Sequence, residues 1–223
     1  MGLVVKYDGD GQHFEPLESG LHHAVCYAVY DLGTHYDERW EKRSRRVLIM
    51  WEIPNERIDI ERDGKMQNLP RAISKRYTLS LHPKSGLRRD LEGWRGKAFT
   101  DDELNGFDLH DLLRANCMLQ VVHKEGNNRT FANISSVSRL MKGLNKLEPE
   151  NGLKFYSFDD GGSLPDGTPE WVADKIHTAD EWQQEFPDMT QSGYANGYEG
   201  LDNDGETIAD HEASFRPDGD VPF

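Results

Sequence analysis

Aromatic and basic side chains are interleaved in the stretch GTHYDERWEKRSRR, residues 33–46. Single-stranded nucleic acid is bound by such a mixture, because Lys and Arg pair with its phosphates and flat aromatic rings stack on its exposed bases. Each stacked base contributes about 1–3 kcal/mol, whatever the base. The stretch therefore predicts contacts with a single strand, and the candidate residues are Tyr36, Trp40, Arg43, Arg45 and Arg46.

A second group of candidates lies in RAISKRYTLSL, where Lys75, Arg76 and Tyr77 are consecutive. Successive side chains of a strand point to opposite faces, so positive charge is expected on both faces here. Tyr77 also shares a face with aliphatic residues, as Trp51 does in its own strand, and core packing is the favoured interpretation for these two rings. Trp94, on an apolar helical stripe, is expected in the core too.

The last predicted strand supplies a third group. Arg129 and Phe131 lie on the face opposite Ala132 and Ile134 in RTFANISSV. If Ala132 and Ile134 point into the core, Arg129 and Phe131 point to solvent. Phe131 is therefore our preferred stacking residue among the strand aromatics.

Net charge divides the chain into two parts. The chain carries -14 in total, and residues 151–223 alone hold 17 acidic against three basic residues, which leaves residues 1–150 neutral. Such asymmetry often marks a polyanion-binding body with an acidic appendage. A solvated surface of mixed charge remains the alternative for any single basic cluster.

The elements that must position these residues are mainly strands. Alternating or apolar runs predict strands at 21–33, 45–54 (ending at a proline) and 71–81, then helices near 84–96 and 108–116, then strands at 117–125 and 129–137. Five strands with a helical insertion between the third and fourth form the order of the OB-fold, a small, partly open barrel. We therefore expect a mainly β OB-fold at 1–150, although other five-stranded folds share this order. Its ligands lie across strands 2 and 3 and the loops 1–2 and 4–5.

Residues 151–223, here named the acidic tail, are rich in Gly, Asp, Glu and Ser and poor in aliphatic residues. We expect the acidic tail to be largely disordered, because it can bury little surface. A short helix is possible near 169–185, where Trp171, Val172 and Ile176 could dock on the body. The chain has no apolar span and no secretion signal, which together with two widely separated cysteines, Cys26 and Cys117, predicts a reducing, cytoplasmic location.

Enzymatic signatures are absent from the sequence. It has no phosphate-binding Gly-rich loop, HExxH, paired Cys motif or nucleophile elbow, and DGDG at 8–11 lacks the remaining ligands of a calcium loop. We therefore predict a non-catalytic protein without a cofactor or a metal.

The sequence ends DGDVPF, in which Asp218 and Asp220 precede Val221, Pro222 and Phe223. This combination offers an apolar plug with negative charges behind it, which a hydrophobic pocket with a basic rim on another protein could bind.

This ending resembles the acidic tip of bacterial single-stranded-DNA-binding proteins, with Val221 in place of their usual isoleucine and an Asp-Gly-Asp spacing. The body, through VLIMWEIP, RAISKRYTLSLHPKSGLRRDLEGWRG, FDLHDLLRANCMLQVVHKE and FANISSV, is similar to phage-encoded single-stranded-DNA-binding proteins with an OB-fold. The resemblance implies coating of single-stranded DNA without strong sequence preference, in the cytoplasm of an infected host. It also implies recruitment of replication, recombination or repair proteins through residues 218–223.

Two other functions are compatible with the residues. The acidic tail could mimic DNA and bind a basic host protein, or the body could be an RNA-binding OB module, because stacking surfaces accept either polymer. We also expect the acidic tail to compete with DNA for the basic surface of its own body. The oligomeric state is left open.

Overall fold

The computed structural model describes residues 15–185 except 39, 63 and 127–129. An antiparallel sheet of five main strands, in the order β3-β2-β1-β4-β5, forms its centre, and a short β6 pairs in parallel with β1. The elements are β1 (Gly20–Asp37), β2 (Lys42–Arg62), β3 (Lys65–Thr78), α1 (Gly86–Arg95), α2 (Asp101–Asn105), η1 (Leu109–Leu112), β4 (Asn116–Glu125), β5 (Thr130–Arg139), β6 (Lys154–Tyr156), α3 (Glu170–His177) and α4 (Asp180–Glu185).

Five main strands with short helices after β3 confirm the coarse fold prediction. The sheet does not close into a barrel among the described residues, since its edge strands β3 and β5 do not pair. Helix α1 lies against both edge strands instead. It approaches β5 so closely that a Cβ on Gly93 would lie 2.5 Å from the carbonyl oxygen of Val137.

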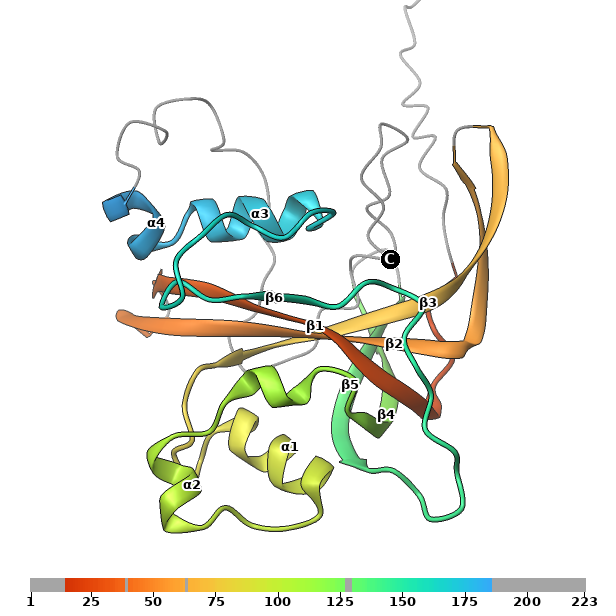
Figure 1. Cartoon of the computed structure of the whole chain (residues 1–223), viewed down its shortest axis with the longest axis horizontal. Coiled ribbons are helices and arrows are strands. Elements are labelled where there is room, and N and C mark those ends of the chain that lie inside the picture. The colour runs from red at the N-terminus through yellow and green to blue at the C-terminus, as the bar shows by residue number, and fades with distance from the viewer. Residues whose placement is uncertain (1–14, 39, 63, 127–129, 186–223) are drawn as a thin grey trace, which may run out of the picture.

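β2 continues past Pro54, where the sequence predicted its end, and β3 begins six residues earlier than predicted and ends at Thr78 rather than at residue 81. The pairing register of β2 with β3 shifts between Ile53 and Arg57. Proline has no N–H to donate to a ladder, and an irregularity of this kind is where a strand tolerates it. The result is a long hairpin that projects from the sheet (Figure 1).

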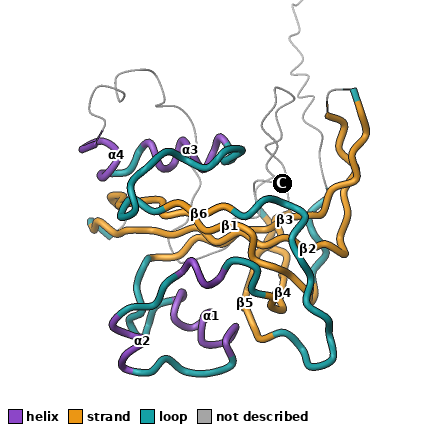
Figure 2. Tube along the Cα trace, in the orientation of Figure 1, coloured by secondary structure: helices purple, strands orange, loops and turns teal. Residues whose placement is uncertain are grey.

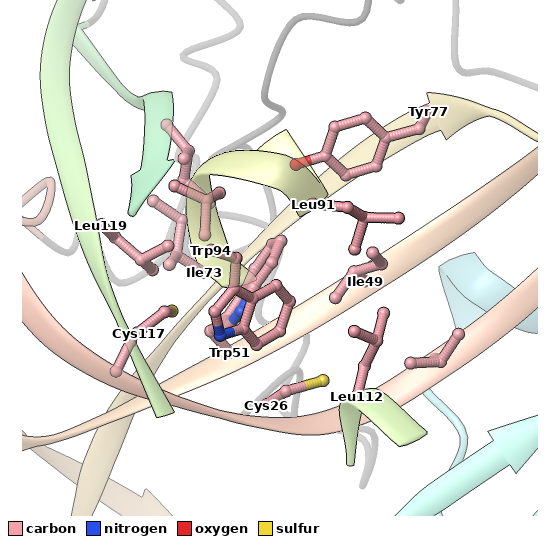
Figure 3. Packing of buried hydrophobic residues seen from close by; sticks show 14 of the residues in the cluster. Cys26, Ile49, Trp51, Ile73, Tyr77, Leu91, Trp94, Leu112, Cys117 and Leu119 are labelled. Atoms are coloured by element: carbon pink, nitrogen blue, oxygen red, sulfur yellow. The ribbon is translucent and has the colours of Figure 1, made fainter. Parts of the chain in front are cut away.

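The first hydrophobic core lies between one face of the sheet and α1. The rings of Trp51 and Trp94 lie 5.6 Å apart within it, and Tyr77 is also buried there (Figure 3). The expected core positions of these three rings are therefore confirmed. Both cysteines are buried here as free thiols, and burial raises the pKa of each.

Local signals explain the helices between β3 and β4. Helix α1 ends at Gly96, whose φ of 68° favours glycine. Thr100 and Glu103 form a capping box at the start of α2. Asp108 caps the 3-10 helix η1, which ends at Leu112, whereas the sequence predicted a helix over 108–116; Asn116 already belongs to β4.

A second hydrophobic core lies on the opposite face of the sheet. Tyr30, Leu48 and Met50 pack there with Val172 and Ile176 of α3. Figures 1 and 2 show β6, α3 and α4 on one side of β1–β3, and α1 and α2 on the other. The packed part of the chain therefore continues past residue 150, where we expected a boundary, to at least the end of α4.

Glu52 binds the backbone at residues 150–151, where the chain leads from β5 to β6 and the second core. Its carboxylate is fully buried and accepts hydrogen bonds from the backbone N–H groups of Glu150 and Asn151, both at 2.9 Å. It also accepts one from Asn151 Nδ2 at 2.6 Å. A charged acceptor with three donors is well satisfied, so this contact fixes the start of the acidic tail.

Candidate nucleic-acid interface

Two aromatic rings are exposed where β1 turns into β2. Tyr36 is 53% exposed and Trp40 is 59% exposed. The Arg43 guanidinium carbon lies 5.8 Å from the centre of the Tyr36 ring, which is within the range of a cation–π interaction. We name residues 36–43, without residue 39, the β1–β2 tip. It brings together three of the predicted site residues, Tyr36, Trp40 and Arg43.

Helix α4 approaches the β1–β2 tip with its acidic residues. Asp180 forms an ion pair with Arg43, and this bond raises the pKa of the guanidinium. Glu181 accepts hydrogen bonds from the backbone N–H and the hydroxyl of Thr34, both at 2.7 Å. Carboxylates of the acidic tail therefore occupy positions at which a nucleic acid could place phosphates.

Arg45 is held by two carboxylates. Its guanidinium forms ion pairs with the buried Asp31 and, at 3.0 Å, with the exposed Asp159, and these bonds raise its pKa. Asp31 also accepts the backbone N–H of Gly33 at 3.0 Å and that of Phe158 at 3.3 Å. Arg45 thus joins the end of β1 to the acidic tail, and part of its charge is already neutralised.

Arg46 and Arg76 lie on the face of the sheet that α3 covers. Arg76 pairs in register with Leu48, which belongs to the second core, and Arg46 lies two residues before Leu48 on the same face. Arg46 forms an ion pair with Asp37 at 3.0 Å. Arg76 is only 8% exposed, and burial lowers its pKa to about 10, with the nearby charge of Arg46 as a smaller cause.

Lys75 and Tyr77 point into the first core. The Lys75 ammonium lies 2.8 Å from Asp90 Oδ2 and 3.0 Å from the carbonyl oxygen of Ile134. The Tyr77 hydroxyl donates to the same Asp90 oxygen at 3.0 Å. Burial lowers the pKa of Lys75, and it raises that of Tyr77. Because neither side chain reaches the surface, we leave both out of the interface proposed below.

Phe131 lies on β5, half-buried, with its ring against the backbone at Gly126, where a Cβ would come within 2.4 Å of the ring. Ala132 and Ile134 are buried, as the alternation predicted, which places Phe131 on the opposite face. Arg129 lies outside the described residues, as do Asp218, Asp220, Val221, Pro222 and Phe223.

The sequence analysis missed two residues that lie near Arg46 and Arg76. Lys175 of α3 is one: burial, together with the charges of Arg76 and Arg46, lowers the pKa of its ammonium. His35 is the other: burial and then the charge of Lys175 lower the pKa of its imidazole to about 4. Lys175 precedes Ile176 in a segment with a net negative charge, and a count of charge over that segment does not single out one lysine. Its place next to an apolar residue that could dock on the body was the available signal.

Neither a metal centre nor a membrane helix is found in the part of the chain that the structure describes. No group of three or more His, Cys, Asp or Glu side chains could hold a metal ion there. No helix in this part is long and apolar enough to cross a membrane. No protein-family model, curated protein or solved structure matches the chain.

Proposed function

We propose that this protein binds and coats single-stranded DNA without strong sequence preference, and that the β1–β2 tip is a central part of the contact surface. The observation that carries the proposal is the exposure of Tyr36 and Trp40 beside Arg43. Rings of this size are mostly buried in proteins, and exposed rings next to a cation offer bases a stacking surface and phosphates a counter-charge.

The fold supports this proposal. We propose that the open five-stranded sheet is an OB-fold, because its strand order and the helices between β3 and β4 agree with that fold. OB-fold ligands lie on strands 2 and 3 and on the loops 1–2 and 4–5. Tyr36 and Trp40 lie at the first of these loops, and Phe131 lies beside the second.

The proposed role is non-catalytic and belongs to phage DNA replication, recombination and repair. Residues 218–223 would recruit proteins of these processes through an apolar plug preceded by acidic residues. The motif formed by Asp218, Asp220, Val221, Pro222 and Phe223 supports this part of the proposal.

We propose further that the acidic tail weakens DNA binding by competing for the same basic side chains. The ion pairs of Asp180 with Arg43 and of Asp159 with Arg45 support this idea. The acidic tail and DNA cannot bind the same arginine at the same time, so DNA that binds the β1–β2 tip would displace these carboxylates.

Fluorescence anisotropy tests the proposed function. A labelled single-stranded DNA of about 30 nucleotides, longer than the roughly 4–16 nucleotides that one OB-fold covers, is titrated with the full chain at two salt concentrations. Duplex DNA and single-stranded RNA of the same sequence serve as competitors. We expect salt-sensitive binding that prefers single-stranded DNA, and a loss of about ten-fold in affinity on Trp40→Ala.

Met141→Ala is the matched control, since it removes an apolar side chain that is 50% exposed on the segment after β5. Equal losses in Trp40→Ala and Met141→Ala would refute stacking on Trp40. Stronger competition by RNA would support the RNA-binding alternative. If the wild type binds no nucleic acid at all, the proposed function is wrong and a basic protein becomes the expected partner.

A further inference from the structure

Three cationic side chains from three elements lie at the interface of α3 with the sheet, near enough for the charges of Arg76 and Arg46 to lower the pKa of Lys175. Arg46 comes from β2 and Arg76 from β3, and both project from the face that carries Leu48 in the second core. Val172 and Ile176 pack α3 onto the same core, and Lys175 directly precedes Ile176. The pairing of β2 with β3 and the packing of α3 on the sheet therefore bring these cations into one region.

Arg76 is the unusual member of this group. Only 8% of the residue is exposed, yet its guanidinium forms no hydrogen bond or ion pair with any residue in the described ranges. A guanidinium has five N–H donors, and those of Arg76 are not among the fully buried atoms that lack a partner, so water or an ion can reach them. Arg76 is therefore arranged as if for an acceptor that no residue in the described part of the chain provides.

Near Arg76, the described cationic groups outnumber the one carboxylate, Asp37, that acts on its charge. Asp37 is bound to Arg46 at 3.0 Å and accepts the backbone N–H of Trp40 at 3.2 Å, so its carboxylate is already in use. The Lys175 ammonium forms no ion pair with a described residue. His35 adds no positive charge at neutral pH, because its pKa is held at about 4. Among the described residues, two arginines and a lysine thus face one carboxylate, which leaves an excess of positive charge there.

We propose that Arg46, Arg76 and Lys175 form a binding site for one phosphate group, here named the phosphate site. The planar forks of the arginines match the oxygens of a phosphate, and the lysine supplies a compact charge on the far side. The phosphate is either a phosphodiester of a bound strand or a free phosphate. The first case rests on the proposed function and makes α3, within the acidic tail, part of the DNA-binding surface.

The position of the site fits the first case. His35, next to the cations, directly precedes Tyr36 in β1. Their side chains leave opposite faces of β1, so a strand whose phosphate lies in the phosphate site would pass around the end of the sheet at the β1–β2 tip to reach the ring of Tyr36. Anchoring one phosphate would fix the register of such a strand, as phosphate contacts do in protein–DNA complexes generally.

Two full-length variants test the phosphate site. Lys175→Met retains the aliphatic stem of the side chain and removes its charge, and Arg76→Met does the same at the buried position. Lys142→Met, which removes an exposed lysine after β5, is the matched control. Thermal unfolding is followed with and without millimolar inorganic phosphate at constant ionic strength, and single-stranded DNA binding is measured as a function of salt.

We expect inorganic phosphate to raise the Tm of the wild type and of Lys142→Met, but not that of Lys175→Met or Arg76→Met. In buffer without phosphate, Arg76→Met should unfold at a temperature no lower than the wild type, because it removes an unpaired buried charge. If the phosphate belongs to DNA, Lys175→Met also lowers the slope of log affinity against log salt by about 0.7, the value for one phosphate of a single strand.

If Lys175→Met loses the rise of Tm with phosphate but keeps the slope of log DNA affinity against log salt, the site is supported and its ligand is free phosphate. A wild type that responds to phosphate but binds no DNA also supports the site, while the proposed function fails. The inference is overturned if phosphate does not raise the Tm of the wild type and Lys175→Met leaves the DNA slope unchanged. It is likewise overturned if phosphate stabilises all four proteins equally.

Discussion

The ammonium of Lys75 lies 2.8 Å from the carboxylate of Asp90 inside the first core, and both side chains are about 95% buried or more. Lys75 also donates to the carbonyl oxygen of Ile134. One side chain of β3 thereby contacts α1 and β5 at the open side of the sheet, where the edge strands β3 and β5 do not pair. The pair takes the place of a barrel closure made by backbone hydrogen bonds.

Lys75→Met should destabilise the protein by at most about 3–5 kcal/mol, because it takes the buried ammonium from Asp90. It leaves that carboxylate with the more exposed Arg89 and the Tyr77 hydroxyl as partners. The double variant Lys75→Met with Asp90→Leu should recover a large part of this loss, since it removes both charges. Urea unfolding measures both values. If the double variant is as unstable as the single one, packing by Lys75 matters more than its charge.

Stability should depend on pH through His35. Its pKa is about 4 in the folded protein, below the ordinary value of 6.5, because of burial and the charges of Lys175, Arg76 and Arg46. Between these two values the unfolded chain binds a proton that the folded chain does not, so stability decreases as pH falls from 6.5 to 4. The decrease attributable to this group is at most about 3 kcal/mol.

The variant His35→Gln isolates this effect, because Gln keeps a donor for the Leu32 carbonyl, to which His35 Nε2 now bonds at 2.8 Å. Chemical unfolding at several pH values should give a flatter profile for the variant than for the wild type. Parallel profiles would mean that His35 does not titrate as described.

Asp180→Asn should increase the affinity for single-stranded DNA a few-fold at low salt, because it releases Arg43 from its ion pair. The gain should disappear at high salt, where screening weakens all of these contacts. Glu170→Gln, an exposed change of the same charge in the first turn of α3, is the control. Equal gains in both variants would show a general charge effect rather than competition at Arg43.

Phe131→Ala should weaken DNA binding with little change in the salt slope, because stacking involves no counterion release. Arg43→Ala should lower that slope. Arg43 is a better comparison than Arg45, which Asp31 holds in a partly buried ion pair. Anisotropy titrations over a range of salt concentrations distinguish the two variants, and equal slope changes would refute stacking by Phe131.

Removal of residues 186–223 should raise DNA affinity at fixed salt, because it removes most of the acidic charge and leaves the second core intact. Removal of residues 151–223 is a different experiment. It also deletes Val172 and Ile176, which are fully buried, and should therefore destabilise the sheet. Anisotropy and thermal unfolding of both truncations check this contrast, and unchanged or lower affinity after the shorter deletion would contradict competition by residues 186–223.

The sequence determined the strands and the first core, because period-two alternation shows which side chains a strand can bury. Ala132 and Ile134 were assigned inward on this basis, and Trp51 and Trp94 were assigned to the core by their aliphatic neighbours. The same signal also set Lys75 among apolar residues. Its positive charge nevertheless suggested a surface, since a buried lysine requires a partner that alternation does not reveal.

Only the tertiary structure supplied that partner, because Asp90 reaches Lys75 from a helix that packs across the open sheet. The same holds for Lys175: the sequence indicated a short helix near 169–185 that could dock through Val172 and Ile176, but it identified no neighbour for the lysine on that helix. Composition averages over a segment, whereas the burial of Val172 and Ile176 depends on the apolar face that β1–β3 present to them. Contacts between distant elements thus decided which cations are buried, which are paired and which lie at the interface of α3 with the sheet.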